Sequence, residues 1–169
     1  MMLTVSFIII AVSIILDQIT KVIAFDNLAP DKTRPFIEGL IEFSYTTNPG
    51  IGWGMLKGMR WLFVPVSSIA IVLVVIALVK YRKKLSPLLS VALSMIAGGG
   101  VGNQIDRIFR GEVIDFLNFQ FIDFPIFNVA DCFVSVGCVL AVISVIFIDK
   151  WILFDDKDKK KVSGEKNDK

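Results

Sequence analysis

The 169-residue sequence contains no histidine and only two cysteines. The missing histidine excludes Ser-His-Asp and Cys-His catalysis and any histidine-ligated metal site. The two cysteines, Cys132 and Cys138, are six residues apart in an apolar segment, so on a helix they point in different directions. We expect both to be buried and chemically inert. Charged residues make up only 20% of the chain, so each one in an apolar stretch is informative.

Apolar residues form 54% of the sequence and gather in four long segments. Each segment is long enough to cross a bilayer, which takes about 20 residues. The first has no basic start and no small-residue cleavage site, so it is interpreted as a helix and not as a cleaved signal peptide. The predicted transmembrane helices are residues 3–25, 61–79, 85–109 and 125–148.

These helices predict an all-α polytopic membrane protein with one domain, residues 1–154. A charged tail, residues 155–169, is short of apolar side chains and is predicted to be cytoplasmic and disordered. No cofactor, no metal and no nucleic-acid partner is expected, and the chain is expected to work as a monomer in contact with membrane lipids.

Basic residues predict the orientation of the four helices. The connection at 80–84 holds four basic residues and no acid, and the chain after Ile148 holds seven lysines. The connection at 26–60 holds four basic residues, and the connection at 110–124 holds one. By the positive-inside rule, the 80–84 connection and the C-terminus are cytoplasmic. Four spans then place the N-terminus inside as well, and the other two connections on the outer face.

Both outer connections contain an alternating pattern that is typical of β-strands. In Ile41–Thr47, apolar and polar side chains alternate, and Leu117–Phe121 follows the same pattern. The two segments are predicted to pair into a small extracytoplasmic sheet that rests on the membrane surface.

Several polar residues lie inside the predicted helices, all in the outer half or at the outer end. A charge at the bilayer centre costs roughly 2.5–3.5 kcal/mol, so such residues are rare and usually functional. They are Asp17 and Lys21 in the first helix, Asn103, Asp106 and Arg107 in the third, and Asn128 and Asp131 in the fourth.

The spacing of these residues distinguishes those that can form structural ion pairs from those that are candidates for catalysis. Asp17 and Lys21 are four residues apart, as are Asp106 and Arg110, so each acid has a base in reach on the same helix face. Both pairs are interpreted first as structural ties, with the first pair at the helix surface near the interface. Asp131 has no basic residue within two turns of its helix, so it is a candidate for catalysis.

Three aspartates, Asp115, Asp123 and Asp131, follow one another at intervals of eight. Two aspartates held close together share a proton, and such a pair can activate a water and bind the carbonyl oxygen that it attacks. Asp115 lies among apolar residues after the third helix and is expected to fold back onto Asp131. Asp123 precedes Pro125, the predicted first turn of the fourth helix, and is expected to cap that helix.

Five short motifs in this order resemble the lipoprotein signal peptidases, the type II signal peptidases of bacteria. They are DQITK (17–21), NPGIGW (48–53), GGGVGNQIDR (98–107), VIDF (113–116) and FNVAD (127–131). The glycines of the third motif also predict close helix packing. The resemblance implies four helices with a small β-cradle and an aspartyl endopeptidase of the bacterial cytoplasmic (inner) membrane, with its active site near the outer face.

By the same resemblance, Asp115 and Asp131 are the catalytic pair. The substrate implied is a prolipoprotein whose lipobox cysteine carries diacylglycerol, cleaved just before that cysteine. The residues implied to bind substrate or support the site are Asn48, Gly50, Asn103, Arg107 and Asn128. Those implied to be structural are Asp17, Lys21 and Asp106. Gly52 and Gly100 stand where the family usually has larger residues, and both are expected near the site.

Two other functions are open at this stage. A small transporter or channel would use the intramembrane acids as a proton relay, although the polar residues give no path to the cytoplasmic side. An assembly factor would use them only to tie helices together.

Overall fold

The computed structural model describes residues 1–29, 32–50 and 60–152. Its long helices are α1 (Met2–Leu28), α2 (Arg60–Lys80), α3 (Pro87–Phe109) and α4 (Val129–Phe147), followed by a short 3-10 helix, η2 (Lys150–Ile152). All four long helices are of a length and composition that can span a membrane, which confirms the four predicted spans. The predicted tail at 155–169 lies outside the described residues.

Local sequence explains where the last two long helices begin. Ser86 caps α3 by accepting a hydrogen bond from the backbone of the first turn, and Pro87 follows it. The start of α4 is four residues later than the sequence predicted, because its cap is Asn128 and Pro125 lies in the preceding irregular segment. Asp123 is exposed in that segment, so the prediction that it caps the helix is wrong.

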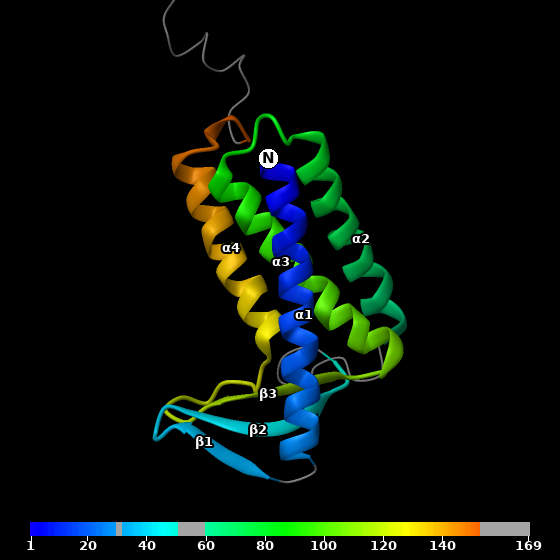
Figure 1. Ribbon diagram of the computed structural model, residues 1–169, viewed down its shortest axis with the longest axis vertical. Helices are drawn as coiled ribbons and strands as arrows, with labels where there is room; N and C mark the ends of the chain where they lie inside the picture. Colours follow the sequence, from blue (N-terminus) through cyan, green and yellow to red (C-terminus); the bar gives the residue numbers. More distant parts are fainter. Residues whose placement is uncertain (30–31, 51–59, 153–169) are drawn as a thin grey trace, which may run out of the picture.

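The central helix is α3, which contacts each of the other three long helices (Figure 1). Its consecutive glycines face different neighbours. A methyl group on Gly98 would lie 2.7 Å from a side chain of α1, one on Gly99 would overlap the backbone of α4, and one on Gly100 would lie 3.0 Å from a side chain of α2. The close packing predicted for this motif is confirmed.

The same packing shows where Gly100 lies, one of the two glycines expected near the site. Gly100 faces α2 and not the polar site, so the expectation that it lies near the site is wrong. Gly52 lies outside the described residues.

The outward surfaces of the helices are apolar. Side chains such as Ile8 and Ile15 on α1, Ile69 on α2 and Val139 on α4 are 55–60% exposed. An apolar surface of this kind suits contact with lipid tails.

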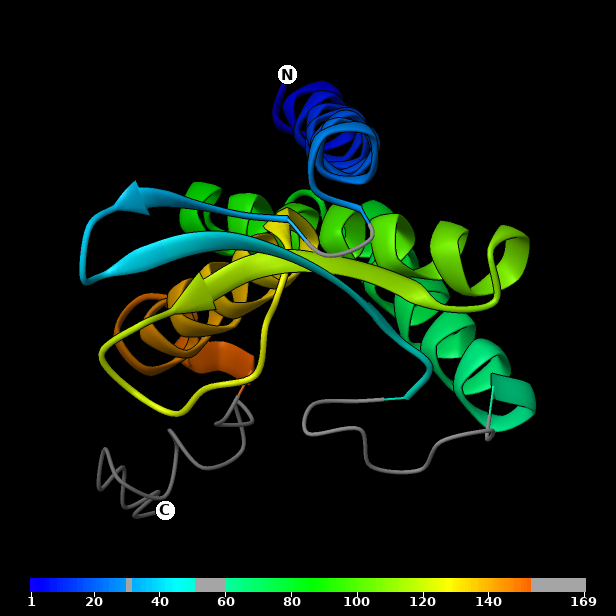
Figure 2. The ribbon, with the colours of Figure 1, turned by 90° about the horizontal axis from the view of Figure 1, so that it is seen from below.

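An antiparallel sheet lies at one end of the helix bundle, and Met1 lies at the other (Figure 1). Its strands, in the order β1-β2-β3, are β1 (Thr33–Ile37), β2 (Ile41–Asn48) and β3 (Val113–Phe119). The predicted strand at 41–47 and its pairing with the second outer connection are confirmed. That partner begins four residues earlier than predicted, and β1 was not predicted. Viewed along the bundle, the strands run side by side across its end (Figure 2).

A small apolar core attaches the sheet to α1. Ala24 and Leu28 of α1 pack with Ile114 and Phe116 of β3. Because successive side chains of a strand point to opposite faces, this contact turns Asp115 to the other side of β3. The sheet thereby presents an aspartate to the space beside α3 and α4.

Candidate active site

Two aspartates from different elements line one cavity of about 480 Å³. Asp115 comes from the middle of β3, where the sequence predicted a loop. Asp131 lies in the first turn of α4. The predicted meeting of these two residues at one place is present. The apolar wall of the cavity, which the sequence did not single out, includes Phe119, Phe124, Phe127 and Val136.

Asparagine amides hold both carboxylates. Asp131 accepts a hydrogen bond of 2.8 Å from the Asn103 amide and one of 3.2 Å from the backbone N–H of Asn128. Asp115 accepts one of 2.6 Å from the Asn128 amide and one of 3.2 Å from the Asn48 amide. Three of the predicted supporting residues therefore contact the pair directly.

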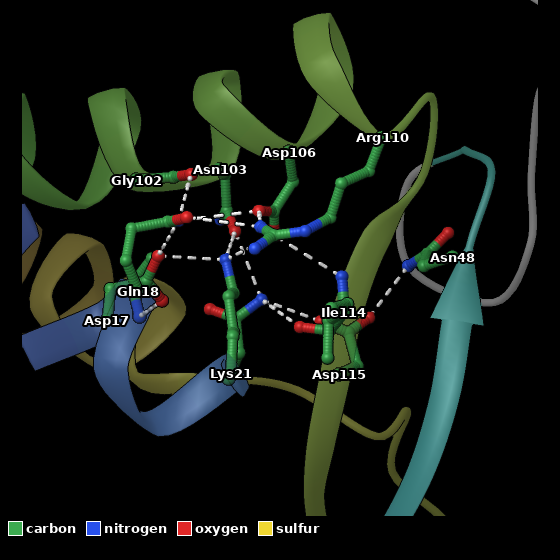
Figure 3. Close-up of polar contacts among 12 residues, drawn as sticks. Asp17, Gln18, Lys21, Asn48, Gly102, Asn103, Asp106, Arg110, Ile114 and Asp115 are labelled. Carbon is green, nitrogen blue, oxygen red and sulfur yellow. Dashed lines mark hydrogen bonds and ion pairs between the residues drawn. The ribbon is translucent and has the colours of Figure 1, made fainter. Parts of the chain in front are cut away.

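A second cluster lies behind these amides and is built from ion pairs (Figure 3). The ammonium of Lys21 lies 2.9 Å from Asp17 Oδ2 and 2.8 Å from Asp106 Oδ2. Arg110 pairs with the other oxygen of Asp106. The two predicted pairs are both present, but Asp17 and Lys21 are 0% exposed, so the prediction of a pair at the helix surface is wrong.

The ion-paired aspartates also hold the backbone next to the catalytic candidates. Asp17 Oδ1 accepts a 3.0 Å hydrogen bond from the N–H of Ala130, the residue before Asp131. Asp106 Oδ2 accepts one of 3.3 Å from the N–H of Ile114, the residue before Asp115. Each structural carboxylate thus fixes one element that carries a site aspartate.

Gln18 reinforces this cluster, a role that was not predicted from the sequence. Its amide nitrogen lies 3.1 Å from Asp17 Oδ2 and 3.3 Å from Asp106 Oδ1. The available signal was its place inside the first motif, one residue after Asp17.

In the described part of the chain, neither Asp115 nor Asp131 forms an ion pair within 4.0 Å. Arg107 lines the same cavity, and its charge attracts both carboxylates at longer range. Burial, followed by the negative charge of Asp131, raises the pKa of Asp115 to about 7, against the opposing effect of its amide donors. Asp115 is only 2% exposed. The site therefore suits a pair that keeps one proton near neutral pH.

The remaining site predictions concern Gly50 and the two cysteines. The N–H of Gly50 donates to Asn48 Oδ1 at 3.0 Å, and Gly50 lines the cavity. Cys132 and Cys138 are both free and exposed on the protein surface, so the expectation that they are buried is wrong. Cys132 also lines the cavity. Within residues 1–29, 32–50 and 60–152, no three potential metal ligands come together.

The sequence of this chain matches a known protein family and its members. The model of the family described as signal peptidase (SPase) II matches residues 9–147. A lipoprotein signal peptidase of Brevibacillus brevis is 38% identical over 143 residues, which cover 85% of this chain and 95% of the relative. One from Bacillus pumilus is 39% identical over 146 residues, with 85% and 94% covered.

Solved structures agree with the sequence comparison. A bacterial membrane enzyme solved by the in meso method superposes with a TM-score of 0.78 at 28% identity, covering 98% of this chain and 94% of that one. A second bacterial membrane enzyme solved by the same method gives 0.76 at 30% identity, covering 86% and 94%.

Proposed function

The chain belongs to the signal peptidase II family, and from that membership we propose that Asp115 and Asp131 are the catalytic pair of this aspartic protease. The family removes signal peptides from prolipoproteins, so a peptide bond is the bond that the pair must break. A transporter, a channel or an assembly factor would not account for family membership over most of the chain. The single observation that carries the proposal is the shared cavity lined by two aspartates without an ion-pair partner in the described residues.

The reaction begins with one proton shared by the two carboxylates. Burial and the charge of Asp131 raise the pKa of Asp115 to about 7, so Asp115 is proposed to carry the shared proton. Asp131 takes a proton from a water molecule as the oxygen of that water attacks the scissile carbonyl carbon. Asp115 donates a hydrogen bond to the carbonyl oxygen as negative charge develops there. A proton then passes from the carboxyl pair to the leaving amine as the peptide bond breaks.

The substrate proposed is a prolipoprotein with a diacylglyceryl cysteine, cleaved just before that cysteine. A cavity with a polar floor at Asp115 and Asp131 and an apolar wall including Phe124 and Val136 supports this choice. The peptide bond would lie on the floor and the adjacent apolar groups on the wall. Asn48, Gly50 and Arg107 would bind or support the substrate at the rim and floor.

The proposed setting is the bacterial cytoplasmic (inner) membrane. The chain would form one domain, residues 1–154, working as a monomer among membrane lipids, with both termini and the tail at 155–169 in the cytoplasm. The site would then lie near the outer face. In a cysteine-free background, an impermeant thiol reagent applied to intact cells should label Lys32→Cys and not Lys83→Cys. The reverse pattern would overturn this orientation.

Replacement of each aspartate by asparagine tests the catalytic pair. Asp115→Asn and Asp131→Asn should each lower turnover of a diacylglyceryl peptide by a factor of roughly 10²–10⁴ or more, because each removes a proton-transfer partner. The double variant should be little worse than either single one, since the pair acts as a unit. All variants should purify as folded protein.

Asp123→Asn is the matched control, because Asp123 is exposed and lies outside the cavity lining. It should keep most of the turnover. An inactive Asp123→Asn beside an active Asp115→Asn would show that the pair is wrongly assigned.

A further inference from the structure

The asparagine amides of the site are turned so that each offers its NH₂ group to a catalytic carboxylate. For two of them, a backbone N–H occupies the amide oxygen. Gly50 N–H donates to Asn48 Oδ1 at 3.0 Å, and Asp131 N–H donates to Asn128 Oδ1 at 3.0 Å. An amide whose oxygen already accepts a fixed donor has only its NH₂ group left for another partner.

The third amide, Asn103, depends on a side chain. Its Oδ1 accepts a hydrogen bond of 2.9 Å from the ammonium of Lys21 and one of 3.0 Å from the Asn128 amide. Its Nδ2 then donates to Asp131 Oδ1 at 2.8 Å. If this amide turned over, its NH₂ group would face two other donors and its oxygen would face a carboxylate. The ammonium and the Asn128 amide together therefore permit one orientation.

Lys21 is itself held without freedom to turn. An ammonium has three N–H donors, and here three acceptors surround it: Asp17 Oδ2, Asp106 Oδ2 and Asn103 Oδ1. Lys21 is 0% exposed and does not belong to the described lining of the cavity. It therefore makes no contact with the cavity, although its charge acts on Asp115 through space and lowers the pKa of that carboxyl.

We propose that Lys21 is a positioning residue that keeps the Asn103 amide turned toward Asp131 and so fixes the carboxylate that activates water. The inference rests on the proposed catalytic role of Asp131. Small misplacements of a reacting group cost large factors in rate. Because Lys21 lies behind Asn103 and away from the cavity, its loss should lower kcat and leave KM almost unchanged.

The test needs a background in which Lys21 can be removed without leaving a buried charge. Asp17→Asn provides it, because Asp106 retains Arg110 as its partner, and the asparagine oxygen can still accept from Ala130. Asp17→Asn alone should keep kcat within about threefold of the unsubstituted protein. Adding Lys21→Met should lower kcat by about 10- to 100-fold, with KM changed less than about threefold and the thermal unfolding midpoint close to that of Asp17→Asn.

A double-mutant cycle separates positioning from a general structural role. Within the Asp17→Asn background, Asn103→Ala should cost about as much kcat as Lys21→Met, and the two together should cost little more than either. If the two substitutions together lowered kcat by the product of their separate factors, Lys21 would not act through Asn103. A kcat for Asp17→Asn/Lys21→Met within threefold of Asp17→Asn would also overturn the proposal.

A more conservative variant covers the case in which methionine prevents folding. Lys21→Gln in the same background keeps an N–H donor, and its kcat should exceed that of the methionine variant. If neither variant gives folded protein, Lys21 is a folding residue and the proposal is rejected. If the unsubstituted protein cleaves no lipidated peptide, the proposed function fails. If only Asp17→Asn is inactive, Asp17 belongs to the chemistry and the positioning scheme is wrong.

Discussion

Two pairs of aspartates lie next to each other in this protein and differ in what surrounds them. Asp17 and Asp106 share the ammonium of Lys21. Asp115 and Asp131 are held by amides and one backbone N–H. An ion pair with a buried ammonium commits a carboxylate to a structural partner. Neutral amides hold a carboxylate in place without a cation, so the proposed proton transfer by the second pair requires no ion pair to be broken.

Burial alone does not separate the two pairs. Asp17 and Asp106 are 0% exposed and Asp115 is 2% exposed, whereas Asp131 is half-buried. The chemical nature of the partners is what the members of each pair share, and we propose that it separates the scaffold carboxylates from the reacting ones.

The largest effect on stability should come from breaking the ion-paired cluster. Lys21→Met alone takes the cation from Asp17, while Asp106 keeps Arg110. Removal of one partner of a buried ion pair costs about 3–5 kcal/mol, so the thermal unfolding midpoint in detergent should fall sharply. Asp17→Asn/Lys21→Met should recover much of this loss. An unchanged midpoint for Lys21→Met would mean that the cluster contributes little to stability.

A smaller loss should come from crowding the same cluster. A Cβ on Gly102 would lie 2.5 Å from Asp17 Oδ2, so Gly102→Ala must displace the Asp17 side chain from its ion pair with Lys21. Overpacking of this kind costs about 1–3 kcal/mol, which calorimetry or thermal unfolding can measure. Gly100→Ala is the matched control, because it meets only an isoleucine side chain of α2, at 3.0 Å. Equal losses for both would show that the position of Asp17 is not what the glycines protect.

The sequence predicted the helices well because length and apolar composition decide membrane spans. It also predicted the alternating strand β2 and the meeting of Asp115 with Asp131. The start of α4 was misplaced because Pro125 resembled a first-turn residue, whereas the cap is Asn128. β1 was missed because all of its residues are exposed, so no buried face produced an alternating pattern.

The burial of the Asp17–Lys21 pair was also beyond the sequence. A four-residue spacing fixes which side chains share a helix face, but it does not say what covers that face. Here α3 and the start of α4 cover it, through Gly102 and Ala130. Only the tertiary arrangement reveals that the pair is enclosed.

The proton held by the reactive pair should set the alkaline limit of activity. The pKa of Asp115 is raised to about 7, so it keeps its proton below that pH and loses it above. Turnover should therefore fall as the pH rises through about 7, toward tenfold per unit. The Asn48 amide stabilises the ionised form of Asp115, so Asn48→Ala should raise the pKa and move this limit upward by less than about one unit, or 1.4 kcal/mol.

The pH profile of kcat for both proteins checks this prediction. Asn103→Ala is a useful comparison, because Asn103 donates to Asp131 and not to Asp115. A downward movement of the alkaline limit in Asn48→Ala would contradict the role given to this hydrogen bond.

The smallest effect should come from removing the thiols, which neither aspartate pair uses. Cys132→Ser/Cys138→Ala should keep kcat within about threefold, because the proton transfers that supply rate belong to carboxylates. Cys132 nevertheless lines the cavity and both thiols are exposed. A small maleimide should therefore inhibit the unsubstituted protein by occupying the substrate space, and Cys132→Ser should resist it. Cys138→Ala, which removes the thiol away from the cavity lining, should remain as sensitive as the parent. If the folded double variant lost turnover without any reagent, the thiol would belong to the chemistry and the contrast between the two aspartate pairs would not explain activity.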